Sequence, residues 1–289
     1  MSKILKSSDY VKLYEKYIED VFTISRNWKE IEGIIAEFEN YDKIEDEDLK
    51  FKIHFLFYNL YKQNGFNDEL EKFIEGFLFN LENRKEYLRL GIVYRDYSYL
   101  KRLKGEYELA YAYIIKSLDN YIKHGDPIRI AIAYNSLGNF YLDTGEFNHA
   151  LENYHKAYEH IKSFDEQDSY YVIKANLANI YLTLNYFTKA KSLYVEDLDR
   201  LKENQLHARY AASLLGIAQI YKEEKRAKLA FKYAKLSVES YEKSKDDVGY
   251  ATAISTLGSI YGLFEKYPEA LVHYEKAKEI LEKIHYKLE

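Results

Sequence analysis

The sequence predicts an all-α protein, a right-handed superhelical solenoid of about seven antiparallel helix hairpins. Three observations lead to this prediction. A residue pattern recurs every forty residues, and apolar residues within each copy follow helical spacing. The 289-residue chain also has only two prolines and twelve glycines, too few for an all-β protein rich in tight turns or for a disordered chain.

The repeat is clearest in the second half of the chain. LGNFY at 137–141 is followed by LANIY at 177–181, IAQIY at 217–221 and LGSIY at 257–261. Alanines keep the same interval at Ala150, Ala190, Ala230 and Ala270. So do the residues expected in turns, which are Gly65, Gly105, Gly145, Asn185, Lys225 and Glu265. Fainter copies begin near 97 and 57, so the repeat extends towards the N-terminus.

Each copy reads as two helices. Apolar residues spaced by three and four predict one helix over 128–143 and a second over 147–162. Asp126-Pro127 is typical of a helix start, and Gly145 of a helix end that needs the left-handed conformation. Gly138 and Ala150 are small where the two backbones should approach most closely. The pattern therefore predicts packing between neighbouring hairpins.

Tyrosines also recur within the repeat. We interpret them as core packing rather than as a platform for stacking bases; they are Tyr61, Tyr141, Tyr181, Tyr221 and Tyr261.

Three segments are expected. Residues 1–48 form an N-terminal helical hairpin, a degenerate repeat, and residues 49–287 form a solenoid of six units. The Leu-Glu at 288–289 is typical of a cloning scar. The last helix, 267–284, is as apolar as an internal one, and no polar capping helix follows it. Either the natural chain continues past 287 into an output module, or this C-terminal helix forms a homodimer.

These residues resemble the tetratricopeptide repeat. The series Gly138, Tyr141, Gly145, Ala150, Tyr154 and Ala157 carries the resemblance, which is clear over 128–284 and fainter over 88–125. The standard repeat has about 34 residues, so both helices are expected to be about a turn longer here. HEAT and armadillo repeats also have periods near forty, but the fixed small positions favour the tetratricopeptide repeat.

Several classes of function are disfavoured. The chain has no cysteine, a formal charge of −5, no signal peptide and no apolar run that could span a membrane. We therefore expect a cytoplasmic protein that binds neither membranes nor, with this charge, nucleic acid. Nucleotide-binding loops and H-E-x-x-H are missing from the sequence, so no enzyme activity, cofactor, catalytic residue or metal site is predicted. The clustered His149, His155 and His160 are interpreted as solvent-exposed. The carboxylates of Glu196, Asp197 and Asp199 are assigned to a solvated helix face.

The resemblance implies that the first helix of each hairpin lines a concave groove in which extended peptides lie. Asparagine carries both a donor and an acceptor and can bind a peptide bond without reading side chains. The candidate peptide-binding residues are Asn135, Asn139, Asn176, Asn179, Gln219, Arg95, Arg102 and Tyr99. The N-terminal part of the groove looks basic, because Lys52, Lys62, Arg95 and Arg102 face only Asp96. An acidic segment of the ligand would lie there. Alternatively, the groove is merely solvated and its asparagines reflect compositional bias.

The sequence therefore predicts a protein- or peptide-binding module. The alternative is a sensory or regulatory domain of a bacterial signalling protein, either a peptide receptor or an input domain fused to an output module. A sensor should change shape or oligomeric state on binding, whereas a plain scaffold should not.

Overall fold

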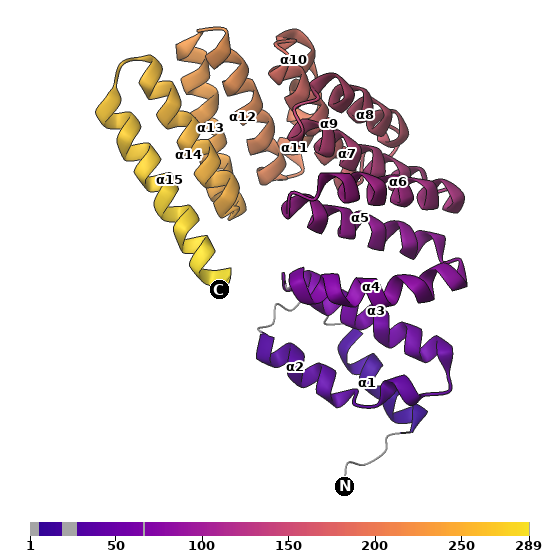
Figure 1. Cartoon of the computed structure of the whole chain (residues 1–289). Coiled ribbons are helices and arrows are strands. Elements are labelled where there is room, and N and C mark those ends of the chain that lie inside the picture. The colour runs from indigo at the N-terminus through magenta and orange to yellow at the C-terminus, as the bar shows by residue number, and fades with distance from the viewer. Residues whose placement is uncertain (1–5, 19–27, 66, 289) are drawn as a thin grey trace. The chain divides into compact units, whose positions relative to one another are not determined.

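The computed structural model describes residues 6–18, 28–65 and 67–288, and helices account for most of them (Figure 1). The chain divides into two compact units, residues 1–126 and 127–289. The predicted all-α architecture of paired helices is confirmed, whereas the predicted boundary at residue 48 stays a prediction. Glu289, part of the predicted cloning scar, lies outside the described residues.

The first unit contains two shorter helices followed by two long helix pairs. Its helices are α1 (Ser7–Ile18), α2 (Trp28–Glu37), the short 3-10 helix η1 (Tyr41–Lys43), α3 (Glu47–Gln63), α4 (Asn67–Arg84), α5 (Tyr87–Leu103) and α6 (Tyr107–His124). Asp46 caps α3, since its side chain accepts hydrogen bonds of 3.0 Å from the amides of Asp48 and Leu49. Helices α4 and α5 pack against each other and join the two pairs.

The second unit repeats one arrangement four times. Its helices are α7 (Pro127–Asp143), α8 (Phe147–Ile161), α9 (Asp168–Thr183), α10 (Phe187–Val195), α11 (Leu198–Glu203), α12 (His207–Glu223), α13 (Ala227–Ser244), α14 (Asp247–Leu263) and α15 (Tyr267–Leu288). The first helices of successive repeats, α7, α9, α12 and α14, also contact one another in that order. Residues at one repeat position on these helices therefore form a row across the unit.

The turns confirm the forty-residue pattern. The six predicted turn residues all have positive φ, between 58° and 77°. Glycine adopts this conformation freely, but the last three positions hold Asn185, Lys225 and Glu265 at a cost of about 1–2 kcal/mol for a side chain with a Cβ. The turn geometry is therefore kept even where glycine is absent.

The small residues of the repeat lie where helices approach most closely, as predicted. A Cβ on Gly138 would come within 2.5 Å of the ring of Tyr154. Ala150 and Ala157 are fully buried. The recurring tyrosines Tyr141, Tyr181, Tyr221 and Tyr261 are buried in the core of the second unit or packed against it, which agrees with their interpretation as packing residues.

Helix α15 leaves apolar side chains uncovered. Leu271, Val272 and Leu281 are exposed, whereas Ala270 and Ala277 on the same helix are buried. No helix in the described part of the chain is long and apolar enough to cross a membrane. Dimerisation through α15 remains a prediction.

Candidate functional site

Three amide side chains form a row across the second unit. Asn139 on α7, Asn179 on α9 and Gln219 on α12 occupy one repeat position, forty residues apart. Their helices contact one another in this order. Asn139 and Gln219 are half-buried and Asn179 is exposed. We call these three residues the amide row.

Two members of the amide row are held by buried tyrosines. The hydroxyl of Tyr154 donates to Oδ1 of Asn139 at 2.7 Å, and the hydroxyl of Tyr194 donates to Oδ1 of Asn179. Tyr154 is 1% exposed and Tyr194 is 4% exposed. Burial raises the pKa of Tyr194 above its usual range, so this hydroxyl stays protonated and donates. Each asparagine therefore has its oxygen fixed from within the hairpin, while its Nδ2 has no hydrogen-bond partner among the described residues.

The other two asparagines pair with each other. Nδ2 of Asn176 on α9 donates to Oδ1 of Asn135 on α7 at 2.9 Å. Both side chains are half-buried, one helical turn from the amide row. The pair cross-links two first helices and still leaves Oδ1 of Asn176 and Nδ2 of Asn135 able to form further hydrogen bonds.

Two of the four basic side chains expected in this region pair with Asp96. Asp96 on α5 contacts Nη2 of Arg95 at 2.7 Å and Nζ of Lys62 at 2.5 Å, and it also accepts the hydroxyl of Tyr58. Burial raises the pKa of Asp96, but the charges of Arg95 and Lys62 outweigh burial and hold that pKa below its usual range. Lys62 and Arg95 thus share this one carboxylate, and binding of an acidic ligand segment in this region stays a prediction.

Tyr99 and Arg102 on α5 form a stacked pair. The guanidinium of Arg102 lies 5.5 Å from the ring centroid of Tyr99, and that ring is half exposed. Like Arg95, these two residues belong to the first unit. The amide row and the two remaining asparagines all belong to the second unit.

Asp197 does not lie on a solvated face, contrary to the sequence prediction. Its carboxylate accepts from Nζ of Lys174 at 2.6 Å, and the two side chains are only 13% and 5% exposed. The same Nζ lies 2.7 Å from Glu196 and 3.2 Å from the hydroxyl of Tyr170. Three oxygens therefore saturate the three donors of this ammonium, which fits a structural ion pair rather than a nucleophilic lysine.

The ion pair lies where a second helix is interrupted. Among the described repeats of this unit, this is the only second helix that is broken into two. Helix α10 ends at Val195 and α11 begins at Leu198, whereas α8 and α13 are continuous. The residues equivalent to Asp197 are the buried Ala157, Ser237 and Ala277. Those equivalent to Lys174 are the half-buried Tyr134 and the buried Leu214 and Ile254. The break gives room to a carboxylate where the other repeats hold small side chains. Lys174 and Asp197 each differ from their counterparts in the other repeats, and the two lie in contact. These two differences are the sequence signal from which the ion pair could have been found.

The described histidines and carboxylates hold no site for a metal ion, since no three of them lie close enough together. His149 pairs with the exposed Glu146, and His155 contacts the hydroxyl of Tyr181 at 2.5 Å. His160 stacks on Tyr134. These histidines thus contact different partners along α8.

Comparison with known families identifies the repeat. Two models of the tetratricopeptide repeat match the chain, one at residues 130–159 and the other at 209–283. A search of curated proteins gave no match. The two matched stretches contain members of the amide row, Asn139 and Gln219.

Solved structures show the same fold. A signal transduction ATPase with numerous domains and a tetratricopeptide repeat sensor, from Pyrococcus horikoshii, aligns with a TM-score of 0.72 and 17% identity over 97% of this chain and 44% of that one. A Rap protein complexed with competence and sporulation factor gives 0.64 and 14% identity, over 97% of this chain and 79% of the other. NprR in complex with its cognate peptide NprX gives 0.61 and 16%, over 97% and 82%. This chain is a repeat protein of the tetratricopeptide type.

Proposed function

We propose that this tetratricopeptide-type chain binds an extended peptide or the tail of a partner protein along the first helices of its second unit. The observation that carries the proposal is the amide row, whose two asparagines have oxygens fixed by buried tyrosines and Nδ2 donors without partners in the described residues. A fixed amide donor can bind a peptide carbonyl with little loss of side-chain freedom.

The spacing of the row suits an extended ligand. Packed helices lie about 8–10 Å apart, and an extended chain rises about 3.3 Å per residue. Successive amides would therefore meet every third residue of the peptide. Asn135 and Asn176 offer further hydrogen-bonding groups one helical turn away. Such contacts address the peptide backbone, so selectivity would have to come from other residues.

Two of the similar structures support this proposal, because Rap and NprR were each solved with a bound peptide or factor. At 14% and 16% sequence identity, the likeness of these proteins to this chain shows a shared fold and does not show a shared ligand. The chemistry of any ligand of this chain rests on its own residues.

The test is peptide binding by variants that change only the amide donors. Linear peptides would be selected on the wild-type chain from a random displayed library and measured by fluorescence polarisation. Asn139→Asp and Asn179→Asp keep an oxygen for the tyrosine hydroxyl but replace the NH2 donor with a negative oxygen. Gln219→Met removes an amide without adding charge.

We expect each of these variants to weaken binding by about tenfold, which corresponds to roughly 1.4 kcal/mol, as for one hydrogen bond with a good partner. Asn148→Asp is the matched control, because Asn148 is exposed on the second helix α8. Unchanged affinity in all three row variants would place binding elsewhere and end the proposal.

A regulatory role is the second candidate. Three of the similar structures that span 97% of this chain are a tetratricopeptide repeat sensor protein and two proteins bound to a peptide or factor. Small-angle scattering with and without a selected peptide separates the two roles. A sensor should change its radius of gyration on binding, whereas a scaffold should keep it.

A further inference from the structure

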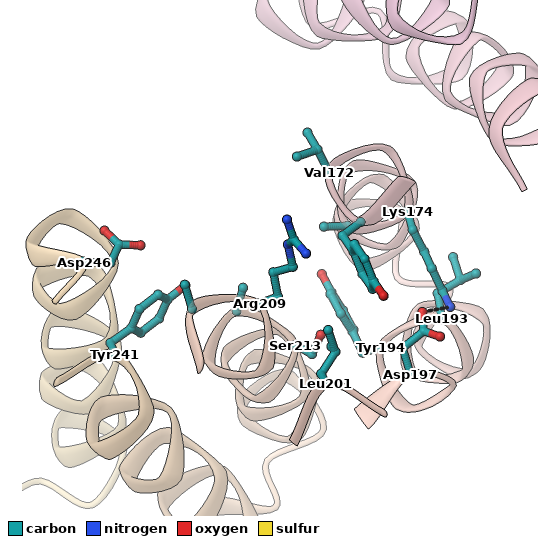
Figure 2. A pocket seen from close by; sticks show the side chains of 14 residues that line it. Val172, Lys174, Leu193, Tyr194, Asp197, Leu201, Arg209, Ser213, Tyr241 and Asp246 are labelled. Carbon is teal, nitrogen blue, oxygen red and sulfur yellow. Dashed lines mark hydrogen bonds and ion pairs between the residues drawn. The ribbon is translucent and has the colours of Figure 1, made fainter. Parts of the chain in front are cut away.

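A small cavity lies within the second unit, about two helical turns along α9 and α12 from the amide row. It has a volume of about 230 Å³ and lies between the N-terminal parts of α9 and α12, next to the break between α10 and α11. Figure 2 shows Val172, Arg209 and Tyr194 around it, with Lys174 bonded to Asp197 at one side.

The cavity exists because this repeat interface is built from small residues. Three alanines line it at positions where the neighbouring repeats have larger side chains. They are Ala175, Ala208 and Ala212. Forty residues before and after Ala175 stand Asn135 and Leu215. The corresponding residues are Asp168 and Val248 for Ala208, and Val172 and Thr252 for Ala212. The missing side-chain volume leaves a space between α9 and α12.

The walls of the cavity are mostly apolar. Tyr171, Leu193, Tyr194 and Leu201 contribute rings and branched chains. The charged groups among the lining residues are paired with other charges or cap a helix, as Asp246 caps α14. Lys174 is saturated by its carboxylates and a tyrosine hydroxyl. An apolar guest would therefore leave these charged groups paired, whereas a charged guest would have to displace one of the existing ion pairs.

Arg209 lies at the edge of the cavity. Its guanidinium is 4.6 Å from the ring centroid of Tyr171 and pairs with Asp168, whose side chain is 86% exposed. An ion pair this exposed contributes little to stability, so Arg209 can move when a ligand enters. The stacked guanidinium adds a flat surface against which an aromatic ring can pack.

We propose that this cavity is an anchor pocket for one bulky apolar side chain, of leucine or phenylalanine size, from the bound peptide. The inference rests on the proposed function and supplies the selectivity that backbone contacts lack. A cavity of about 150 Å³ is enough to hold benzene, so 230 Å³ admits one such side chain but not a drug-sized molecule.

The position fits a peptide on the amide row. Val172, which lines the cavity, and Asn179 are seven residues apart on α9, which is about 10 Å along the helix. An extended peptide covers that distance in about three residues. If the peptide continues from the amide row along α9, one of its side chains could therefore enter the cavity about three residues from the peptide bond that meets Asn179.

The test uses single blocked amino acids, so it does not depend on an identified ligand. N-acetyl-phenylalaninamide, N-acetyl-leucinamide and N-acetyl-glycinamide would be titrated into the full chain with labelled alanine, leucine and valine methyl groups. We expect the first two to shift the methyl signals of Ala208, Ala212 and Leu201 saturably, and the glycine compound to leave them unchanged. Equal shifts with all three compounds, or shifts confined to other residues, would overturn the proposal.

Two variants refill the pocket with residues of the kind that neighbouring repeats use. Ala212→Ile and Ala175→Leu should each weaken binding of the phenylalanine compound by at least about tenfold, as loss of an anchor contact does. Thr252→Ile makes a comparable change at the equivalent position on α14 and should not affect it. Wild-type affinity in both refilled variants would refute the anchor pocket.

The same variants separate this inference from the proposed function. If a selected peptide loses affinity in Asn139→Asp but not in Ala212→Ile, the peptide site stands and the pocket is refuted as its anchor. If the blocked amino acids bind the cavity while the amide-row variants leave peptide binding unchanged, the proposed function fails and, with it, the role assigned to the pocket.

Discussion

Replacing Asp197 by alanine, the residue that the preceding repeat carries at Ala157, tests the buried ion pair of the second unit. The substitution removes the acceptor 2.6 Å from Nζ of Lys174, whose side chain is 5% exposed. Breaking such a pair costs about 3–5 kcal/mol, because the remaining charge stays buried. Glu196 remains 2.7 Å from the same Nζ and is partly solvated, so we expect the lower end, about 3 kcal/mol.

The double variant Lys174→Leu with Asp197→Ala should behave differently. It places in this repeat the side chains found at Leu214 and Ala157, and it removes both buried charges. Glu196, which loses Lys174, is exposed, and Arg200, which loses Asp197, keeps its ion pair with Asp165. Replacing a buried pair by apolar residues is often neutral or stabilising. The double variant should therefore lie within about 1 kcal/mol of the wild type, although its two changes are each destabilising alone.

The assay is urea unfolding of the full chain followed by circular dichroism, with thermal melting in parallel. About 3 kcal/mol corresponds to a fall in melting temperature of roughly 6–12 °C for a unit of this size. A loss below about 1 kcal/mol for Asp197→Ala, or a double variant as unstable as that single one, would refute the reasoning.

Three further predictions concern packing, the amide row and pH. Gly138→Ala should cost about 1–3 kcal/mol in unfolding experiments, because its Cβ would meet the ring of Tyr154 at 2.5 Å, whereas Gly76→Ala, with open space around it, should stabilise by up to about 1 kcal/mol. Asn139→Ala should destabilise by about 1–3 kcal/mol, since it removes the acceptor 2.7 Å from the buried Tyr154 hydroxyl, and Asn139→Asp should cost clearly less. Burial, with a contribution from Lys50, holds the pKa of His54 below its ordinary value of about 6.5. The contribution of His54 to the free energy of unfolding should therefore be fully present above that pH and be lost as the pH falls through it. His54→Phe should flatten this dependence of the free energy of unfolding on pH, measured from pH 7.5 to 5. A slope unchanged by that substitution would contradict the assignment to His54.

The repeat architecture could be predicted because it depends on short-range patterns. A turn that needs positive φ, a small residue at a close approach and helical spacing of apolar residues are each visible within one repeat. Comparison between copies then identified Lys225 and Glu265 as turn residues, although neither residue type favours that conformation. Their position in the forty-residue repeat, and not their own conformational preference, indicated that these two residues lie in turns.

The hydrogen bonds of the site could not be predicted in the same way. Whether Tyr154 reaches Asn139 depends on the rotation of two helices about their axes, which spacing alone does not fix. The sequence assigned both groups of asparagine to a ligand. The structure instead shows that some of their hydrogen-bonding capacity is used within the unit, and this changes which substitutions make a fair test.

The buried ion pair was missed for a related reason. Asp197 alone looks like one of several acidic residues near the end of a helix, and Lys174 alone looks like a lysine on a surface helix. Each differs from its counterparts in the neighbouring repeats, but only the fold shows that the two lie 2.6 Å apart. A joint search for unusual residues across repeats would have found them both.

The most direct test of the central claim is the response of the amide side chains themselves. The side-chain NH2 signals of Asn139, Asn179 and Gln219 would be followed by nitrogen-15 NMR during titration with a selected linear peptide, with Asn148 on α8 as the internal reference. The account predicts that the three signals shift together and saturate at the same peptide concentration as the measured affinity, while Asn148 does not move. Saturable binding that leaves all three signals in place, with shifts on α15 instead, would contradict it.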